Sequence, residues 1–256
     1  MSKVIVAGRG GCGKSTVVTL LAKVLGERGR VLVVDTDESN LGLGNMLGIE
    51  QKSMSLMNCL GGKSVVREKL LASMKDDGEK MNLFADDLNL DNLPNECHDK
   101  NENISYLRIG KIERSMEGCA CPMGSVARSF LKELDVDDDE WVIVDTEAGV
   151  EHFGRGLLEG ADVILMVVDP THESVLLAER AKKLAEEVNK KYMVVLNKVD
   201  ETTRGFLEKG LTEKGIEVSG ALSNSQEILE ANLYGNQLLV DDVKKEVESL
   251  IEKIKS

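Results

Sequence analysis

Residues 8–15 of the chain have the spacing of a phosphate-binding loop, Gly-x4-Gly-Lys-Ser. Glycines in such a loop let backbone N–H groups converge on phosphate oxygens, and the dipole of the helix that follows strengthens the attraction. Lys14 would place its charge on the β- and γ-phosphates, and Ser15 would bind Mg²⁺ through its hydroxyl. The pattern therefore predicts a nucleotide site, whose contacts from this loop are Gly10, Gly11, Cys12, Gly13, Lys14, Ser15 and Thr16.

The alternative for this loop is a glycine-rich turn without a ligand. A strand-like run from Lys3 to Ala7 precedes the loop, however, and a helical pattern follows it. A phosphate-binding loop requires this context, so the sequence favours the nucleotide site.

Acidic side chains end two apolar runs further along the chain. Asp35 and Asp37 follow one run, and Asp145 ends another. In an α/β sheet the carboxyl ends of the strands face the ligand crevice. We expect Asp145 to hold Mg²⁺ or its water together with Ser15, and Asp37 to lie in the same magnesium site and orient the water that attacks the γ-phosphate. The alternative for each aspartate is a helix cap or a turn.

The segment Asn197-Lys198-Val199-Asp200 follows a further strand-like run. It fits the base-recognition element of P-loop GTPases, in which the aspartate pairs with guanine. A polar turn at the end of a strand explains Asp200 equally well. We therefore expect Asn197 to lie near the base and leave both roles open for Asp200.

Cys119-Ala120-Cys121 places two thiolates where both could project towards one metal ion. Soft thiolates suit zinc, copper(I), nickel or iron–sulfur chemistry. One pair makes only half of a four-coordinate site, and a two-fold symmetric dimer would complete it. The alternative is that both cysteines pack as small apolar side chains, as cysteines commonly do.

The remaining cysteines, Cys12, Cys59 and Cys97, lack partners at ligand spacing and are interpreted as structural or incidental. Five cysteines cannot all pair within one chain, and the sequence shows no export signal, so reduced thiols are expected. His152 could be a metal ligand, but a loop residue that senses phosphate is the preferred interpretation.

These residues need a scaffold that brings distant strand ends together. Continuous apolar runs recur at Val31–Asp35, Trp141–Asp145, Val163–Val168 and Tyr192–Leu196, with amphipathic helical patterns between them. Such alternation predicts an α/β fold, a mainly parallel sheet with helices on both faces. No linker or repeat interrupts it, so residues 1–256 are expected to form a single domain.

Two regions depart from this alternation. Residues 39–101 are expected to form short helices and an irregular loop over one side of the sheet. Residues 104–112 resemble a strand, and a helix is expected from Met123 to Leu134, opened by Pro122. The amphipathic tail, Val243 to Lys255, lacks an aromatic anchor, so we expect it to dock on the sheet rather than on a membrane.

The composition limits the partners that the protein can have. With 45 acidic and 32 basic residues, the formal net charge is −13. This charge argues against nucleic acid and against anionic lipid as partners. The apolar runs are much shorter than the ~20 residues that a membrane span needs. A cytoplasmic protein is therefore expected.

The loop resembles the deviant P-loop of the MinD/ParA/nitrogenase-iron-protein class of ATPases. In that class a lysine after the first glycine reaches across an ATP-bound dimer to the partner's phosphates. Here that position is Arg9, a departure, although arginine can act in trans in the same way. The resemblance implies a catalytic role for Arg9, in addition to the catalytic roles expected above for Lys14 and Asp37.

Within this class, three segments resemble the CooC/AcsF nickel-insertion ATPases, which mature carbon monoxide dehydrogenase or its acetyl-CoA synthase partner. They are Glu117–Pro122, Asp145–Arg155 and Val168–Pro170, and the likeness runs from residue 3 to about residue 200. The resemblance implies a homodimer in which Cys119 and Cys121 of both subunits bind one Ni²⁺, or Zn²⁺ in its place. It also implies that ATP binding and hydrolysis release the metal to the client enzyme.

Three other functions compete with this hypothesis. The first is a MinD/ParA-like nucleotide-driven positional or regulatory switch without metal, which predicts a basic DNA surface or a strong membrane helix. An iron–sulfur carrier related to the nitrogenase iron protein would have widely spaced cysteines. A plain GTPase would use Asp200 to select guanine.

Overall fold

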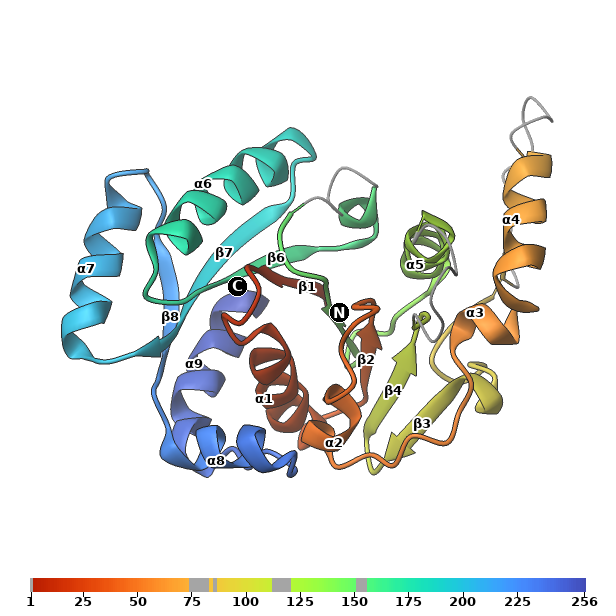
Figure 1. Cartoon of the computed structure of the whole chain (residues 1–256), viewed down its shortest axis with the longest axis horizontal. Coiled ribbons are helices and arrows are strands. Elements are labelled where there is room, and N and C mark those ends of the chain that lie inside the picture. The colour runs from red at the N-terminus through yellow and green to blue at the C-terminus, as the bar shows by residue number, and fades with distance from the viewer. Residues whose placement is uncertain (1, 74–82, 85–86, 112–120, 151–155) are drawn as a thin grey trace.

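One sheet runs through the computed structural model, which describes residues 2–73, 83–84, 87–111, 121–150 and 156–256 (Figure 1). Its strand order is β3-β4-β2-β5-β1-β6-β7-β8, and every neighbouring pair is parallel except β3 and β4. The strands are β1 (Ser2–Gly8), β2 (Val31–Asp35), β3 (His98–Asn101), β4 (Ile104–Arg108), β5 (Trp141–Asp145), β6 (Val163–Val168), β7 (Lys191–Val199) and β8 (Val218–Ser223). The expected α/β fold with a mainly parallel sheet is confirmed.

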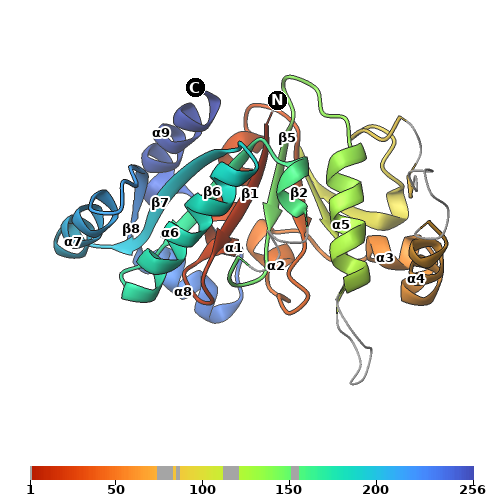
Figure 2. The ribbon, with the colours of Figure 1, turned by 90° about the horizontal axis from the view of Figure 1, so that it is seen from above.

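Helices cover both faces of the sheet. They are α1 (Lys14–Gly26), α2 (Leu43–Leu47), α3 (Leu56–Cys59), α4 (Gly62–Ser73), α5 (Cys121–Glu133), α6 (His172–Glu187), α7 (Glu201–Thr212), α8 (Gln226–Tyr234) and α9 (Lys244–Lys255). In Figure 1, α5 and α6 lie above the sheet, and α1, α8 and α9 lie below it. Figure 2, seen from above, shows α5 and α6 nearest the viewer.

The side chains on the two faces of each central strand pack into two separate layers of the hydrophobic core. Successive residues of a strand point to opposite faces, so Val4 and Val6 of β1 join the layer with α1 and α9, whereas Ile5 and Ala7 join the layer with α5 and α6. The strands β2 and β5 are buried along their whole length. This burial explains why both strands are continuous apolar runs up to the aspartate at their carboxyl end.

The amphipathic tail packs against the protein, as expected. The apolar face of α9 is buried, and its lysine-bearing face is exposed. No helix in the described part of the chain is long and apolar enough to cross a membrane.

The region between β2 and β5 differs from expectation in three details. The strand expected over residues 104–112 ends at Arg108, because the carbonyl of the next residue, Ile109, accepts from the N–H of Met57 and not from a neighbouring strand. The helix expected from Met123 begins earlier, at Cys121, and ends at Glu133. The short strand β3 was not expected, since its sequence His-Asp-Lys-Asn has no apolar alternation.

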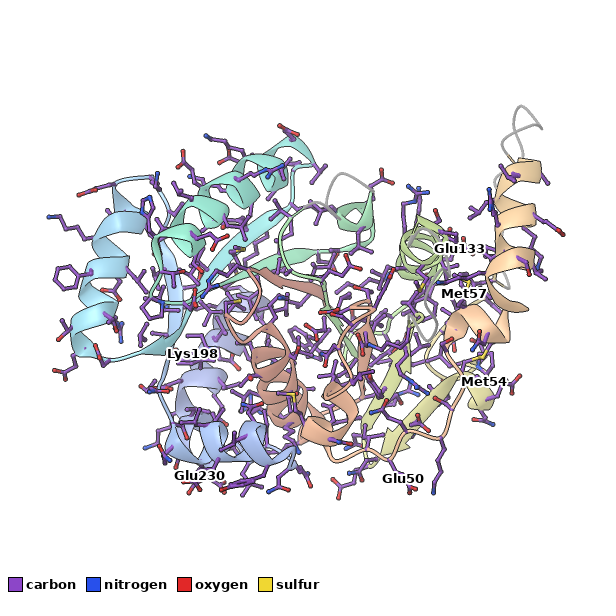
Figure 3. All side chains as sticks on the ribbon, in the orientation of Figure 1. Glu50, Met54, Met57, Glu133, Lys198 and Glu230 are labelled. Atoms are coloured by element: carbon purple, nitrogen blue, oxygen red, sulfur yellow. A yellow bond between two sulfur atoms is a disulfide. The ribbon has the colours of Figure 1, made fainter. Side chains whose placement is uncertain are left out.

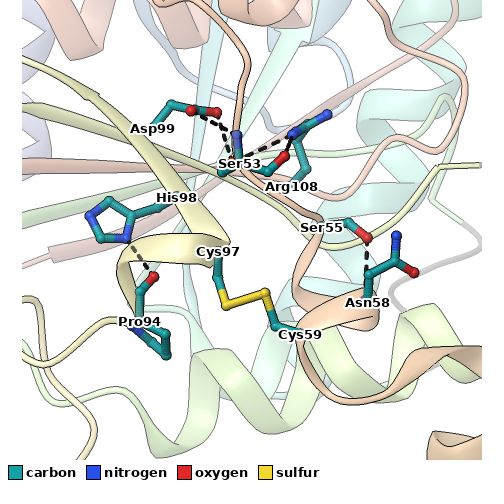
Figure 4. Close-up of a disulfide and its surroundings, with 9 residues drawn as sticks. All are labelled: Ser53, Ser55, Asn58, Cys59, Pro94, Cys97, His98, Asp99 and Arg108. Carbon is teal, nitrogen blue, oxygen red and sulfur yellow. Dashed lines mark hydrogen bonds between the residues drawn. A yellow bond between two sulfur atoms is a disulfide. The ribbon is translucent and has the colours of Figure 1, made fainter.

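Two cysteines expected to be reduced form a disulfide. Cys59 at the end of α3 and Cys97 are bonded, with their Cα atoms 6.2 Å apart (Figure 4). The two residues are 38 positions apart, so no local spacing indicates the pair. The bond joins α3 to the turn before β3 at the edge of the sheet. Cys12 is a free, buried thiol.

Candidate functional site

The phosphate-binding loop connects β1 to α1 at the carboxyl edge of the sheet. Gly11 and Gly13 have positive φ angles of 78° and 97°, which favour glycine. A Cβ atom on Gly13 would collide with the side-chain amide of Asn197. The loop geometry therefore explains the glycine at position 13 in two independent ways.

Two residues at the end of β7 brace this loop. The Asn197 amide donates to the carbonyl of Cys12 at 2.8 Å, and the Lys198 ammonium donates to the carbonyl of Gly11, also at 2.8 Å. Lys198 has a positive φ of 60°, unusual for a residue with a side chain. Figure 3 labels it where β7 ends. Both side chains line the cleft described next.

A cleft of about 870 Å³ opens along the carboxyl edge beside the loop. Its walls come from the loop, from the segments after β2 and β5, and from the segment after β8 with α8. At the α8 end, the lining residues include Asn224, Ile228, Leu229 and Asn232. The cleft therefore joins a phosphate-binding end to a mixed polar and apolar end, as a nucleotide requires.

The predicted magnesium ligands Ser15 and Asp145 lie together, with Ser15 on the wall of this cleft and Asp145 buried beside it. The Ser15 hydroxyl donates to Asp145 Oδ2 at 2.6 Å, and the Asn40 amide donates to the same oxygen at 3.0 Å and to Ser15 Oγ at 2.9 Å. Asp145 Oδ1 is buried without a hydrogen-bond partner among the described atoms. A hard cation would satisfy that oxygen. Mg²⁺ uses few protein ligands and keeps water and phosphate oxygens, so these residues fit it.

Burial raises the pKa of Asp145 to about 7, and the charge of nearby Asp35 acts in the same direction. The hydrogen bond from Ser15 and the charge of Lys14 oppose this shift. A carboxyl group in this setting holds a proton easily when no cation is present. A bound divalent ion would favour its ionised form.

Asn40 is a site residue that sequence reasoning missed. It lies in the loop between β2 and α2, where an asparagine carries no local signal of its role. Its amide is held by Ser15 and Asp145, while the carboxylate of the predicted ligand Asp37 accepts hydrogen bonds from the backbone and hydroxyl of Ser39. Asp37 lines the cleft but is turned towards its own loop.

The two predicted catalytic cations are held by different groups. The buried Lys14 ammonium donates to the carbonyl of Arg9 at 3.2 Å. The Arg9 guanidinium binds both carboxylate oxygens of Asp169 at 2.7 and 3.0 Å, and it donates to Thr171 Oγ1 at 3.1 Å. Partial burial alone would raise the pKa of Asp169, but hydrogen bonds from Arg9, Ser174 and Thr171 lower it. The Arg9 side chain is therefore held by residues that directly follow β6.

Of the two roles left open for Asp200, guanine recognition and a polar turn at the end of a strand, the structure shows the second. Its carboxylate accepts from the backbone N–H of Thr203 at 2.8 Å and caps the first turn of α7 in a capping box. It is exposed and is not among the residues that line the cleft. The structure thus offers no support for a guanine-selecting aspartate at this position.

Replacing Asp200 by alanine is expected to lower the thermal unfolding midpoint by a few degrees, because α7 loses its cap. The ratio of ATP to GTP affinity should stay unchanged. Differential scanning fluorimetry and nucleotide competition measure the two effects. Asn197→Ala is the comparison variant, expected to weaken binding of both nucleotides because the loop loses a brace. A selective loss of GTP binding in Asp200→Ala would contradict the capping role.

The predicted metal-binding cysteines are only partly described. Cys121 is the first residue of α5. Cys119 and His152 lie outside the described residues. Among the residues that the structure does describe, no three His, Cys, Asp or Glu side chains are grouped to hold a metal ion.

Comparisons with known proteins agree with this geometry. The CbiA family, described as the CobQ/CobB/MinD/ParA nucleotide binding domain, matches residues 3–239. An uncharacterized ATP-binding protein of Methanocaldococcus jannaschii is 42% identical over 251 residues, which cover 97% of this chain and 99% of that protein. The carbon monoxide dehydrogenase accessory protein CooC of Rhodospirillum rubrum is 29% identical over 187 residues, 73% of this chain and 70% of that protein.

Solved structures show the same fold. The septum site-determining protein MinD of Pyrococcus horikoshii, complexed with Mg-ADP, matches with a TM-score of 0.68 at 16% identity, covering 100% of this chain and 96% of that chain. At this identity the likeness concerns the fold alone.

Proposed function

Because the chain belongs to the CbiA family of CobQ/CobB/MinD/ParA nucleotide-binding domains, we propose that its ATPase cycle delivers nickel to a client enzyme. The metal would bind to Cys119 and Cys121 of two subunits in a homodimer, as a cargo rather than a resident cofactor. The client would be carbon monoxide dehydrogenase or acetyl-CoA synthase. We place the protein in the cytoplasm and take residues 1–256 as one domain.

The position of Cys121 carries this proposal. It opens α5, and the first turn of α5 borders a cavity of about 30 Å³ between the segments that follow β2 and β5. Thr36 and Glu38 contribute from the first segment, and Glu147 from the second. Both segments also line the nucleotide cleft. A thiolate site at the start of α5 would therefore adjoin the loops that meet the γ-phosphate.

The similarity to CooC adds the client. That protein is named as an accessory protein of carbon monoxide dehydrogenase, and it shares 29% of its residues with this chain over the aligned region. Nickel and zinc both bind thiolates, so Zn²⁺ could take the place of Ni²⁺. Since the thiols must lose protons, binding of either metal would strengthen as the pH rises.

Five residues at or beside the cleft would have separate parts in hydrolysis. Mg²⁺, when bound, would neutralise charge on the phosphoryl group that is transferred. Ser15 and Asp145 would hold it, and Asn40 would have to give up its hydrogen bonds to them. Lys14 would turn from the carbonyl of Arg9 to the β- and γ-phosphates. Asp37 would orient the attacking water.

Arg9 would act on the partner's nucleotide. Its guanidinium does not line its own cleft and is bound to Asp169 instead. Formation of the dimer would have to exchange this ion pair for contacts with the partner's phosphates. This exchange would make hydrolysis depend on the assembled dimer.

An anaerobic Ni²⁺ titration with light-scattering mass tests the proposal. The wild type is expected to bind one Ni²⁺ per dimer, and Cys119→Ala/Cys121→Ala to bind none, because both pairs of thiolates are needed for a four-coordinate site. Cys59→Ser/Cys97→Ser is the matched control, since these two sulfur atoms are bonded to each other and offer no thiolate for a metal. It should keep the nickel stoichiometry.

Unchanged nickel binding in the Cys119→Ala/Cys121→Ala variant would overturn the metal site. A second outcome would favour the alternative, a MinD/ParA-like switch without metal. In that outcome neither the wild type nor the variant binds nickel, and both still form a dimer when ATP is added.

A further inference from the structure

A buried ion pair lies where the chain leaves β4. The Lys111 ammonium donates to Asp35 Oδ2 at 2.7 Å, and it also donates to the backbone carbonyl of Asp37. The Lys111 side chain is 9% exposed and that of Asp35 is fully buried. The Tyr106 hydroxyl donates to the same Asp35 oxygen at 2.7 Å. One ammonium group thus ties the end of β4 to the loop that follows β2.

Stability alone is a weak explanation for this pair. Desolvating two charges costs much of what their attraction contributes, and packed apolar side chains of similar volume often stabilise a core equally well. A buried pair has a clearer use where it fixes the position of a segment. Lys111 fixes the backbone of Asp37, the residue assigned to the attacking water.

The residue before Lys111 contacts the start of α5. A Cβ atom on Gly110 would collide with Met123 Sδ, and it would lie 3.6 Å from Met57 Cβ. The Gly110 backbone therefore lies directly against Met123, which is in the first turn of α5. Figure 3 labels Met57 on α3, below α5. Any displacement of the chain at Lys111 would be transmitted to this tightly packed contact.

The described contacts form a continuous connection between two sites. It runs from the Asp37 carbonyl through Lys111 to Gly110, and from there through Met123 to the turn that Cys121 opens. The cleft is at one end of this connection, and the proposed metal site is at the other. Tyr106 donates to Asp35 Oδ2, whereas the other oxygen, Asp35 Oδ1, accepts from the N–H of Asp37 at 3.1 Å.

We propose that Lys111 is a positioning residue that couples the nucleotide state of the cleft to the first turn of α5. This inference deepens the proposed function, on which it rests, by naming the device that regulates the metal site. When Asp37 shifts to engage the γ-phosphate and its water, Lys111 follows the carbonyl to which it is bonded. Gly110 then moves against Met123 and displaces the start of α5.

Hydrogen exchange of α5 tests this coupling without any metal. The exchange rates of its amides are compared between the Mg-ADP and Mg-ATPγS states. In the wild type, a difference of about fivefold or more is expected in the first turns of α5, within the usual range of coupling between sites. In Lys111→Met/Asp35→Asn, which removes both charges together, the two states should give the same rates while nucleotide still binds.

Two further variants separate coupling from general damage. Tyr106→Phe removes a hydrogen bond to the same Asp35 oxygen but leaves the link to Asp37, so it should keep the wild-type difference. Lys111→Arg keeps a charged donor and should restore most of it. If the double variant does not fold, Lys111→Gln replaces it, because its shorter side chain cannot span both acceptors, and it should shrink the difference.

A wild-type difference that persists in the Lys111 variants would overturn the inference, and so would identical rates in the two states of the wild type. These outcomes are independent of the nickel titration. The metal site can therefore fail while the coupling stands, and the coupling can fail while nickel still binds.

Discussion

Replacing Arg9 by alanine is expected to lower the rate of ATP hydrolysis by about 10³-fold and to leave nucleotide affinity nearly unchanged. The affinity should persist because Arg9 is bound to Asp169 and Thr171 and does not line its own cleft. The rate should fall because the partner's phosphates lose a charge that stabilises the transition state. Steady-state hydrolysis and a fluorescent-nucleotide titration measure the two quantities.

Arg28→Ala is the matched control for Arg9. Arg28 forms exposed ion pairs with Glu248 and Glu252, and its loss should leave hydrolysis unaffected. Mixing Arg9→Ala with Asp145→Asn gives a sharper test. Neither variant is expected to hydrolyse ATP at an appreciable rate alone, but a mixed dimer would contain one site with an intact carboxylate and an intact arginine from its partner. Recovery of ATP hydrolysis on mixing would support action of Arg9 in trans. A loss of nucleotide affinity in Arg9→Ala as large as its loss of hydrolysis rate would contradict it.

Asp145 is expected to make the nucleotide-free protein less stable as the pH rises from about 4 to about 7. Its pKa is raised from the ordinary value of 3.8 to about 7 by burial. Between these values the folded protein keeps a proton that the unfolded chain releases, so a higher pH favours unfolding. The stabilising contribution is complete below the unfolded pKa and is lost above the folded one. Asp35 is shifted in the same direction, so the two carboxyls titrate as a pair.

Asp145→Asn should remove most of this slope. At pH 8 the variant is expected to unfold at a higher temperature than the wild type, and near pH 4 to lose that advantage. At about 1.4 kcal/mol per pKa unit, the full effect amounts to several kcal/mol. Its Mg²⁺-dependent nucleotide binding should be lost at the same time. Thermal unfolding in nucleotide-free, metal-free buffers at several pH values measures the slope.

Asp169→Asn is the control of opposite sign. The pKa of Asp169 is lowered, so its ionised form contributes stability at neutral pH that is lost as the pH falls through the folded pKa. That variant should therefore unfold at a lower temperature than the wild type at pH 8. Equal slopes in Asp145→Asn and the wild type would contradict the assignment of the pH dependence to Asp145.

The parts of the site that could be predicted are those that a short stretch of sequence defines. The spacing from Gly8 to Ser15 is local, and an apolar run that ends in an aspartate places Asp145 at the carboxyl edge. Neither depends on knowing which strands are neighbours. The sheet itself follows from the same runs, because buried parallel strands and amphipathic helices have distinct patterns.

The parts that could not be predicted join residues that are distant in the sequence. Arg9 meets Asp169 across 160 positions, and Lys111 meets Asp35 across 76. Each pair depends on the strand order, which brings β6 beside β1 and β4 beside β2. Asn40 is nearer to its partners, but it is in a loop with no periodicity to indicate where its amide points.

The strand order also determines when the nucleotide site can form during synthesis. The strand β1, which carries the phosphate-binding loop, pairs with β5 and β6 and with neither of the strands that directly follow it in the chain. Both neighbours are made more than 130 residues later, so β1 lacks its neighbouring strands until Val168 has been synthesised, and the loop lacks its braces Asn197 and Lys198 for longer still. Pairing over such separations is slow and leaves apolar strands exposed meanwhile. We therefore expect ATP to stabilise this protein only late in its synthesis, once these distant strands have paired.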